Sequence, residues 1–240
     1  MPSPPAPFLI VAVDGGAASG KSSLARALAA RFNFLHVDTG AHYRAVTLAL
    51  RRARVSPDDA PAVAAALAHL PLATQVSGQA ARLALAGNSA GQQNDDDDLR
   101  SEDVNTHVSR FAALPAVRRF LFDYQRGQAA VAREHGFAGL VMEGRDIGSV
   151  IFPDAGLRLF LTADPATRAR RRAAEGQTDA VAERDRLDTA RATAPLTCPP
   201  GAVVIDSSAL TLDAVVARAS SLVEAAMTSA STRNSSSSPA

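Results

Sequence analysis

A glycine-rich stretch near the start of the chain contains the residue types that bind phosphate. It reads Gly15-Gly16-Ala17-Ala18-Ser19-Gly20-Lys21-Ser22-Ser23 and fits the pattern G-x-x-x-x-G-K-[ST] from Gly15 to Ser22. Small residues let backbone N–H groups curl around an anion, and a helix that begins here presents its positive N-terminal end to that anion. In such a loop Lys21 reaches the β- and γ-phosphates while the Ser22 hydroxyl binds Mg²⁺. The stretch therefore predicts a site for a nucleoside triphosphate and Mg²⁺.

Lys21 is the only lysine of the chain. The other 24 of the 25 basic residues are arginines. A compact ammonium suits a crowded phosphate loop, whereas arginine serves elsewhere as the cation of the surface. This distribution supports the assignment of Lys21 to the phosphates.

Two further segments place charged residues directly after short apolar runs. The first reads Asp38-Thr39-Gly40-Ala41-His42-Tyr43-Arg44, and Arg44 offers a two-pronged donor to a phosphate. The second reads Glu143-Gly144-Arg145-Asp146-Ile147-Gly148. If the apolar runs are strands of a parallel sheet, both segments and the phosphate loop meet at its carboxyl edge, where such sheets bind ligands.

A third basic segment follows later in the chain. Arg184, Asp188 and Arg191 lie on one helical face if residues 180–192 are helical. An exposed helix with an ordinary ion pair explains one such contact, but not two arginines aligned just before the turn Ala194-Pro195. Transfer of a γ-phosphoryl group spreads negative charge over the transferred oxygens, and arginine donors stabilise that charge while they exclude water. We expect this segment to close over the phosphate site.

The elements that must position these residues alternate between strand and helix. Apolar runs without polar alternation occupy residues 8–13, 34–37, 139–142, 157–161 and 202–205. Such runs are typical of strands that are covered on both faces. Helical patterns occupy residues 21–31, 40–52, 165–174 and 211–227. The alternation predicts an α/β fold in which helices flank a five-stranded parallel sheet.

Residues 71–100 break this alternation. Residues 76–79 and 82–88 alternate around turn glycines, which predicts a small antiparallel insert on the edge of the parallel sheet. Residues 95–98 are four consecutive aspartates. Because adjacent carboxylates repel and cannot all face one ion, we interpret this run as a solvated surface loop rather than a metal site.

Both ends of the chain have the composition of tails. Residues 1–7 are Pro, Ser and Ala apart from Met1, and residues 228–240 are dominated by Ser without a large apolar anchor. We expect both segments to be disordered. A single domain over residues 8–227 remains.

The composition excludes several classes of protein. A net charge of +1 over 240 residues argues against a protein that grips polymeric nucleic acid. The single cysteine, Cys198, excludes a disulfide framework and a multi-cysteine zinc site. No apolar run is long enough to span a membrane and no signal peptide is present, so a cytoplasmic location is the default expectation. A monomer is the default expectation for the oligomeric state.

Taken together, these segments resemble the bacterial cytidylate kinases, a branch of the nucleoside monophosphate kinases of the P-loop class. The phosphate loop is similar to theirs, and residues 38–44 resemble their D-[ST]-G-A-x-Y-R segment. Residues 143–155 resemble their [DE]-G-R-D-[IM]-G-[ST]-V-[VI]-F-P-D-A signature, and residues 184–196 their R-D-x-x-D-x-x-R-x-x-[AS]-P-L lid. The resemblance extends from about residue 8 to about residue 226.

The resemblance implies transfer of the γ-phosphoryl group of ATP to CMP or dCMP, with Mg²⁺. It implies a P-loop kinase domain with a nucleoside monophosphate-binding insert at about residues 71–100 and a short lid at about residues 172–192. In this family pattern Asp38 belongs to the acceptor segment, and Thr39, Arg44, Arg145 and Arg184 hold the acceptor's phosphate. Arg191 would bridge the transferred group, and Asp188 would meet the ribose. Ser109, Arg118 and Asp146 would meet cytosine, whose N4 amino group donates and whose N3 and O2 accept hydrogen bonds.

Two other functions fit the same motifs. A P-loop kinase could act on another acceptor, such as a different nucleoside monophosphate or a hydroxy acid. Alternatively, the chain could be a nucleotide-dependent switch that hydrolyses slowly and signals to a partner. The aligned Arg184 and Arg191 favour a kinase over a switch, because a switch often borrows its arginine from its partner.

Overall fold

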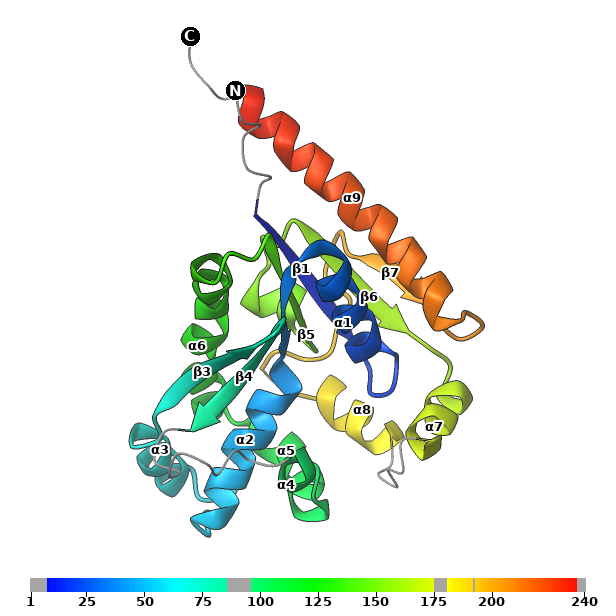
Figure 1. Cartoon of the computed structure of the whole chain (residues 1–240). Helices are drawn as coiled ribbons and strands as arrows, with labels where there is room; N and C mark the ends of the chain where they lie inside the picture. The colour runs from blue at the N-terminus through cyan, green and yellow to red at the C-terminus, as the bar shows by residue number, and fades with distance from the viewer. Residues whose placement is uncertain (1–7, 86–95, 175–180, 192, 237–240) are drawn as a thin grey trace.

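One seven-stranded sheet forms the centre of the molecule within residues 8–85, 96–174, 181–191 and 193–236, which the computed structural model describes (Figure 1). Its strand order is β3-β4-β2-β5-β1-β6-β7. The strands are β1 (Leu9–Gly15), β2 (Phe34–Asp38), β3 (Leu72–Ser77), β4 (Ala80–Leu85), β5 (Gly139–Gly144), β6 (Leu157–Thr162) and β7 (Val203–Asp206). The α/β class and the five predicted parallel strands, in the order β2-β5-β1-β6-β7, agree with the prediction.

The expected count of five strands is wrong for the sheet as a whole. The hairpin of β3 and β4 joins the same sheet, because β4 pairs in parallel with β2 through His36↔Ala80 and Val37↔Ala81. The backbone N–H of His36 also donates to the Gln79 carbonyl at 2.7 Å. The hairpin thus satisfies the polar backbone of β2, which would otherwise be the edge of the sheet.

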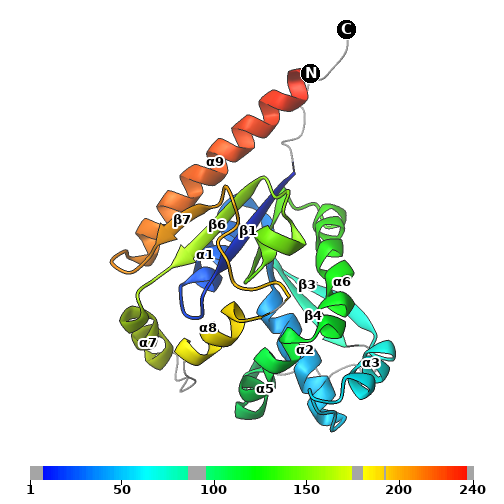
Figure 2. The ribbon, with the colours of Figure 1, turned by 180° about the vertical axis from the view of Figure 1, so that it is seen from behind.

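Helices cover both faces of the sheet. They are α1 (Lys21–Phe32), α2 (Thr39–Arg52), α3 (Ala60–Ala68), α4 (Asp96–Leu99), α5 (Glu102–Ala113), α6 (Pro115–Glu134), α7 (Pro165–Ala174), α8 (Val181–Thr189) and α9 (Leu212–Ser236), with a π-helical turn, η1, at Ile147–Ile151. In β1, Val11 and Val13 pack with α1 and α9, whereas Ala12 packs with α6 on the other face (Figures 1 and 2). Strands β1, β2 and β5 lack polar alternation because both of their faces are buried.

The C-terminal helix is longer than predicted. We expected a disordered tail from residue 228, yet α9 continues to Ser236. The buried Val215, Ala219 and Val223 anchor its first half to the core. Beyond them, the hydroxyls of Thr228 and Ser229 donate to backbone carbonyls four residues earlier, at 3.0 and 2.9 Å. These polar side chains therefore find hydrogen-bond partners within the helix itself. Residues 1–7 and 237–240, also predicted as tails, lie outside the described residues.

The helix expected over residues 180–192 is shorter in the structure. It ends at Thr189, so Arg191 follows the helix rather than forming part of it. Ala194 has a φ of +52° and precedes Pro195, whose ring disfavours a helical conformation in the residue before it. A helix that ran on through residue 194 would therefore be unfavourable.

The acidic run begins a short helix, not a loop. Within α4, Asp98 forms an ion pair with Arg52 at 2.7 Å, and both side chains are about half exposed. This contact agrees with the solvated interpretation of the run. Asp95 and the segment before it lie outside the described residues.

The carboxyl ends of three central strands lie side by side. Asp38 at the end of β2 is in register with Glu143 of β5, and Asp14 at the end of β1 is in register with Gly144. The phosphate loop continues from β1 at the same edge. The topology therefore brings the phosphate loop, residues 38–44 and residues 143–148 together, as the parallel arrangement predicts.

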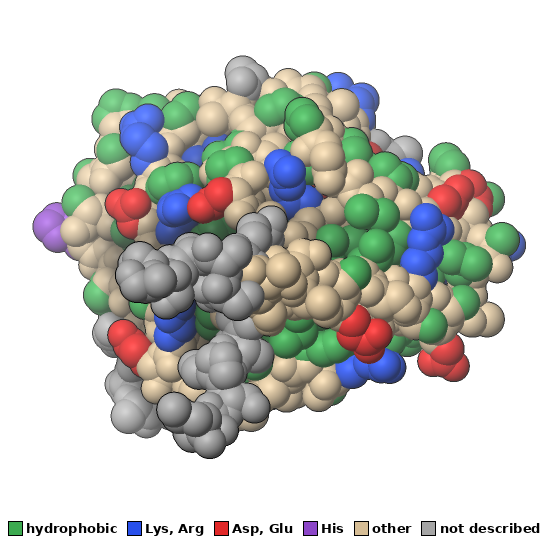
Figure 3. Space-filling view, turned by 90° about the horizontal axis from the view of Figure 1, so that it is seen from above, with side chains coloured by type: hydrophobic (Ala, Val, Ile, Leu, Met, Phe, Trp, Pro, Cys, Tyr) green, Lys and Arg blue, Asp and Glu red, His purple; other side chains and the backbone are tan. Residues whose placement is uncertain are grey.

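Positive charge is dispersed on the face seen from above. Figure 3 shows basic side chains there standing singly among apolar and acidic ones. None of the helices in the described part of the chain combines the length and apolar composition that a bilayer crossing requires.

Candidate functional site

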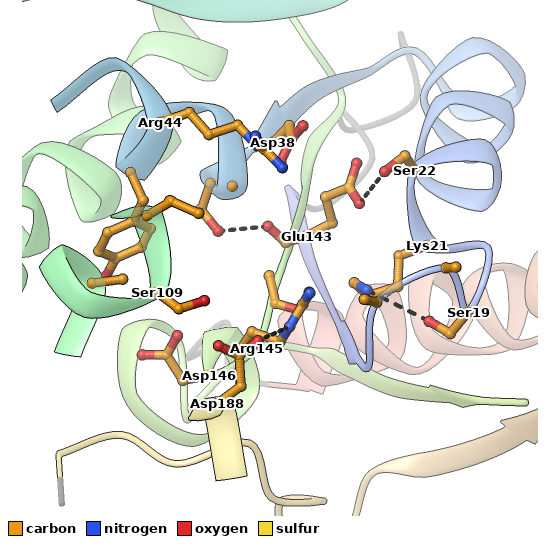
Figure 4. A pocket seen from close by; sticks show the side chains of 18 of the residues that line it. Ser19, Lys21, Ser22, Asp38, Arg44, Ser109, Glu143, Arg145, Asp146 and Asp188 are labelled. Carbon is orange, nitrogen blue, oxygen red and sulfur yellow. Dashed lines mark hydrogen bonds and ion pairs between the residues drawn. The ribbon is translucent and has the colours of Figure 1, made fainter. Parts of the chain in front are cut away.

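A cleft at the carboxyl edge of the sheet gathers most of the predicted site residues. Its cavity volume is about 410 Å³. It is lined by Ala17, Ala18, Ser19, Gly20, Lys21, Ser22 and Ser23 from the phosphate loop, and by Asp38, Thr39, Arg44, Ser109, Arg145, Asp146, Asp188 and Arg191 from the remaining segments. Figure 4 shows Lys21 and Ser22 on one side of this cleft and Ser109 and Asp146 on the other.

Three predicted site residues do not line the cleft, and the side chain of a fourth is not described. Gly15 closes β1 with a φ of +149°, and a Cβ there would lie 2.2 Å from the Leu161 carbonyl oxygen, so only glycine fits. Gly16 lies beneath the side chains of Arg168 and Asp185. Arg118 forms a buried ion pair with Asp146, which does line the cleft. Arg184 belongs to α8, but its side chain lies outside the described residues.

The Lys21 ammonium is buried, and its hydrogen-bond partners are neutral oxygen atoms of its own loop. Its Nζ donates to the Gly16 carbonyl at 2.7 Å and lies 3.5 Å from Ser19 Oγ. Burial, followed by repulsion from Arg145, lowers the pKa of Lys21 to about 7. An anion in the loop would stabilise the charged form of Lys21, and this makes the loop a receptive site for phosphate.

Ser22 is held by a glutamate of a neighbouring strand. Its Oγ donates to Glu143 Oε2 at 2.7 Å, and Glu143 Oε1 lies 2.9 Å from His36 Nε2. Mg²⁺ prefers oxygen ligands and takes few of them from the protein. A serine hydroxyl at the start of α1 beside a buried carboxylate fits that preference, so the residues present suit the predicted metal.

Asp14 joins the phosphate loop to the Arg145 segment. Its two carboxylate oxygens accept the backbone N–H groups of Ile147 and Gly148 at 2.8 and 2.7 Å. Burial raises the pKa of Asp14 to about 6, while these two hydrogen bonds oppose the shift. The contact fixes the turn that directly follows Arg145 and Asp146.

The arginines on the other side of the cleft are paired with aspartates. Arg145 Nε donates to Asp188 Oδ2 at 2.8 Å, and Arg191 pairs with Asp188 Oδ1. Burial lowers the pKa of Arg191, and the Asp188 carboxylate opposes that change. Burial also raises the pKa of Asp146, which Arg118 opposes. Two arginines that share one carboxylate form a cationic site that can accept a more highly charged anion.

The Asp38–Arg44 segment is placed by its helix. The Asp38 side chain caps α2 by accepting the Ala41 N–H at 3.3 Å. Thr39 Oγ1 donates to the Glu143 carbonyl at 2.7 Å, which ties α2 to β5. Arg44 reaches Asn105 Oδ1 at 2.7 Å. These contacts hold the start of α2 at the cleft.

Sequence reasoning gave no individual role to several residues of the site. Glu143 and Arg172 line the cleft, and Asp14 and His36 support it from within the sheet. The position of Glu143 at the end of an apolar strand was a usable signal. His36, by contrast, stands in the middle of an apolar run, where no sequence pattern indicates its partner.

One acidic residue of α8 reaches the phosphate loop. Asp185 Oδ1 accepts the Ala17 backbone N–H at 3.0 Å, and its other oxygen pairs with Arg168. A loop N–H therefore binds a carboxylate oxygen in this structure. This contact agrees with an anion-binding role for the loop.

Comparison with known proteins gives a consistent result. The family model described as cytidylate kinase matches residues 11–225. The cytidylate kinase of Corynebacterium efficiens is 40% identical over 228 residues, covering 90% of this chain and 95% of that protein. Those of Mycobacterium leprae and Pelotomaculum thermopropionicum are 39% and 40% identical, and cover 90% and 87% of this chain and 96% and 93% of the respective relatives. The matches span both sides of the cleft.

Proposed function

This chain belongs to the cytidylate kinase family, and we propose that it transfers the γ-phosphoryl group of ATP to CMP or dCMP, which yields ADP and CDP or dCDP. The observation that carries the proposal beyond family membership is the pairing of two anion sites in one cleft. Lys21 and Ser22 lie on one side of the cleft, Arg145 lies between Lys21 and Asp146 in Figure 4, and Arg191, which shares Asp188 with Arg145, also lines the cleft.

ATP would bind on the side of the phosphate loop. The backbone N–H groups of residues 15–23 and the Lys21 ammonium would hold the β- and γ-phosphates. Ser22 would hold Mg²⁺, which when bound neutralises charge on the phosphate oxygens. Arg172, which is buried and lines the cleft, would add positive charge there.

CMP would bind on the side of the paired arginines. Its phosphate would take contacts from Thr39, Arg44, Arg145 and Arg184, with Arg191 bridging to the transferred group. A phosphate dianion can displace the Asp188 carboxylate from Arg145 and Arg191, because it offers them more charge. The released Asp188 would then be available to accept a hydrogen bond from the ribose.

Cytosine would lie near the buried Arg118–Asp146 pair. The Asp146 carboxylate can accept a hydrogen bond from the N4 amino group, while Arg118 and Ser109 can donate to ring acceptors. Arg118 fixes the Asp146 side chain through their ion pair. The pair thus offers a donor and an acceptor in a defined arrangement.

The transfer needs no protein base. An oxygen of the CMP phosphate, already an anion, attacks the γ-phosphorus, and the bond from that phosphorus to the β,γ-bridging oxygen breaks. The electron pair of that bond leaves with ADP. Positioning and charge neutralisation supply the catalysis.

A coupled assay of ADP release tests the proposal. The purified protein with Mg-ATP should release ADP when CMP or dCMP is added, and much less when UMP or AMP is added. A preference for AMP would contradict the cytidylate assignment. Slow ADP release that no nucleotide acceptor stimulates would favour a switch instead.

A further inference from the structure

His36 is a buried imidazole in the middle of the sheet. It lies on β2, between β4 and β5, with 8% of its surface exposed. Both neighbours of His36 in the chain, Leu35 and Val37, are fully buried core residues. Burial of a polar ring at such a position costs folding free energy unless the ring is hydrogen-bonded. The identity of its hydrogen-bond partner therefore indicates the role of the ring.

The partner of His36 is the carboxylate that holds Ser22. His36 Nε2 lies 2.9 Å from Glu143 Oε1, while Glu143 Oε2 accepts from Ser22 Oγ at 2.7 Å. Because an ionised carboxylate only accepts hydrogen bonds, Nε2 must carry the proton and donate it. Glu143 is therefore held by one donor on each oxygen, and its side chain is 3% exposed.

This arrangement decides what the Ser22 hydroxyl can offer. A hydroxyl has one proton and two lone pairs. Since Glu143 takes the proton, the Ser22 oxygen keeps its lone pairs for another partner, and a metal cation binds through such lone pairs. A carboxylate free to rotate would leave this orientation undefined.

We propose that His36 is a positioning residue, which acts through Glu143 to orient the Ser22 hydroxyl oxygen toward Mg²⁺. The inference rests on the proposed function, because that function provides the metal with ATP. His36 touches neither nucleotide nor metal. Its role is to fix the carboxylate that fixes the ligand.

Calorimetric titration with ATP, in the presence of Mg²⁺ and in EDTA, tests this role without measuring turnover. Mg²⁺ should raise the ATP affinity of the wild type, and we expect this increase to be about 10-fold smaller in the His36→Leu variant. That factor is the lower end of the usual effect of such supporting residues. Affinity for ATP in EDTA should be unchanged, because the loop backbone and Lys21 remain.

Two amide variants separate the hydrogen bond from simple packing. The side-chain nitrogen of glutamine reaches about as far as Nε2 of histidine, whereas that of asparagine reaches only about as far as Nδ1. His36→Gln should therefore restore the Mg²⁺-dependent gain, and His36→Asn should not. This comparison decides the question even if His36→Leu fails to fold.

His42 provides a matched control. It is also a buried histidine, with 1% of its surface exposed, but neither of its ring nitrogens has a hydrogen-bond partner. His42→Leu should leave the Mg²⁺-dependent gain at the wild-type value.

Two results would overturn the inference. If the wild type shows the Mg²⁺-dependent gain and both His36→Leu and His36→Asn retain it in full, His36 does not orient the site. If the wild type itself shows no such gain, the metal-dependent ATP site of the proposed function fails, and the inference fails with it.

Discussion

The two sides of the cleft differ in how their positive charge is compensated. On the phosphate-loop side, the hydrogen bonds of Lys21 go to a carbonyl and a hydroxyl of its own loop. On the acceptor side, Arg145 and Arg191 share the Asp188 carboxylate, and Arg118 is paired with Asp146. The Lys21 ammonium would gain a directly bonded anion when nucleotide binds, whereas Arg145 and Arg191 would have to exchange the Asp188 carboxylate for a phosphate.

The helix α8 contributes to both sides. Asp185 contacts the phosphate loop and Asp188 contacts the acceptor arginines, three residues further along the same helix. Residues with this spacing lie on neighbouring positions of one helical face. Phosphates that bind on either side would therefore compete with a carboxylate of the same helix.

Removal of the Lys21 ammonium should produce the largest effect. We expect Lys21→Ala to lower kcat by about 10³-fold or more, in line with the loss of a preorganised cation at a transferred phosphoryl group. Because the ammonium is buried and has a lowered pKa, its removal should not lower the thermal unfolding temperature. Initial-rate assays of ADP formation measure kcat, and a thermal melt measures the unfolding temperature.

Lys21→Arg is the matched control. The larger guanidinium carries the same charge but not the compact shape, so it should not restore activity. Near-normal turnover of Lys21→Ala would remove the phosphate-loop assignment.

Removal of Asp188, unlike removal of the Lys21 ammonium, should markedly lower the stability of the protein. Asp188→Ala leaves Arg145 and Arg191 without their shared carboxylate, and we expect the free energy of unfolding to fall by about 3 kcal/mol. CMP should then stabilise the variant more than it stabilises the wild type, because its phosphate replaces the missing anion. Urea unfolding with and without CMP measures both effects. An unchanged stability would contradict the idea that the acceptor side depends on its own counter-ion.

Asp146 should control which base is accepted. We expect Asp146→Ala to reduce the preference for CMP over UMP, measured as the ratio of kcat/KM values, by about 10-fold, since a hydrogen bond to a charged group is lost. The KM for ATP should change far less. The preference of Asp146→Asn, which keeps one carbonyl oxygen, should lie between those of the wild type and Asp146→Ala. Equal losses with CMP and UMP would argue that Asp146 only supports the fold of the cleft.

Nucleotide binding should change the protonation of Lys21. With its pKa at about 7 in the free protein, Lys21 is mostly neutral at pH 8, and bound phosphates should raise that pKa. Binding of ATP at pH 8 should therefore take up as much as about one proton, and the contribution of Lys21 should vanish below about pH 6, where the ammonium is already charged. Calorimetry in buffers of different ionisation enthalpy counts these protons. CMP alone should produce no comparable uptake at Lys21.

The phosphate-loop side could be predicted from the sequence because its signals are local. The loop, the strand before it and the helix after it are contiguous, and Gly15 is required by the backbone itself. Strands β1, β2 and β5 could be recognised because burial on both faces removes their polar alternation.

The pairing on the acceptor side could not be predicted in the same way. The motifs indicated Arg145 and Asp188 individually, but their contact joins residues 43 positions apart. The same holds for Ser22 with Glu143, which are 121 positions apart. No sequence pattern indicated His36, because its hydrogen-bond partner, Glu143, lies on a neighbouring strand. The extension of α9 was missed because its Ser-rich composition also describes disordered tails.

A crystal structure of the protein with CMP bound tests this division of the cleft most directly. We predict that the CMP phosphate contacts Arg145 and Arg191, that both are separated from Asp188, and that the backbone of residues 15–23 keeps its present conformation. A CMP phosphate bound elsewhere, with the Arg145–Asp188–Arg191 contacts intact, would contradict it.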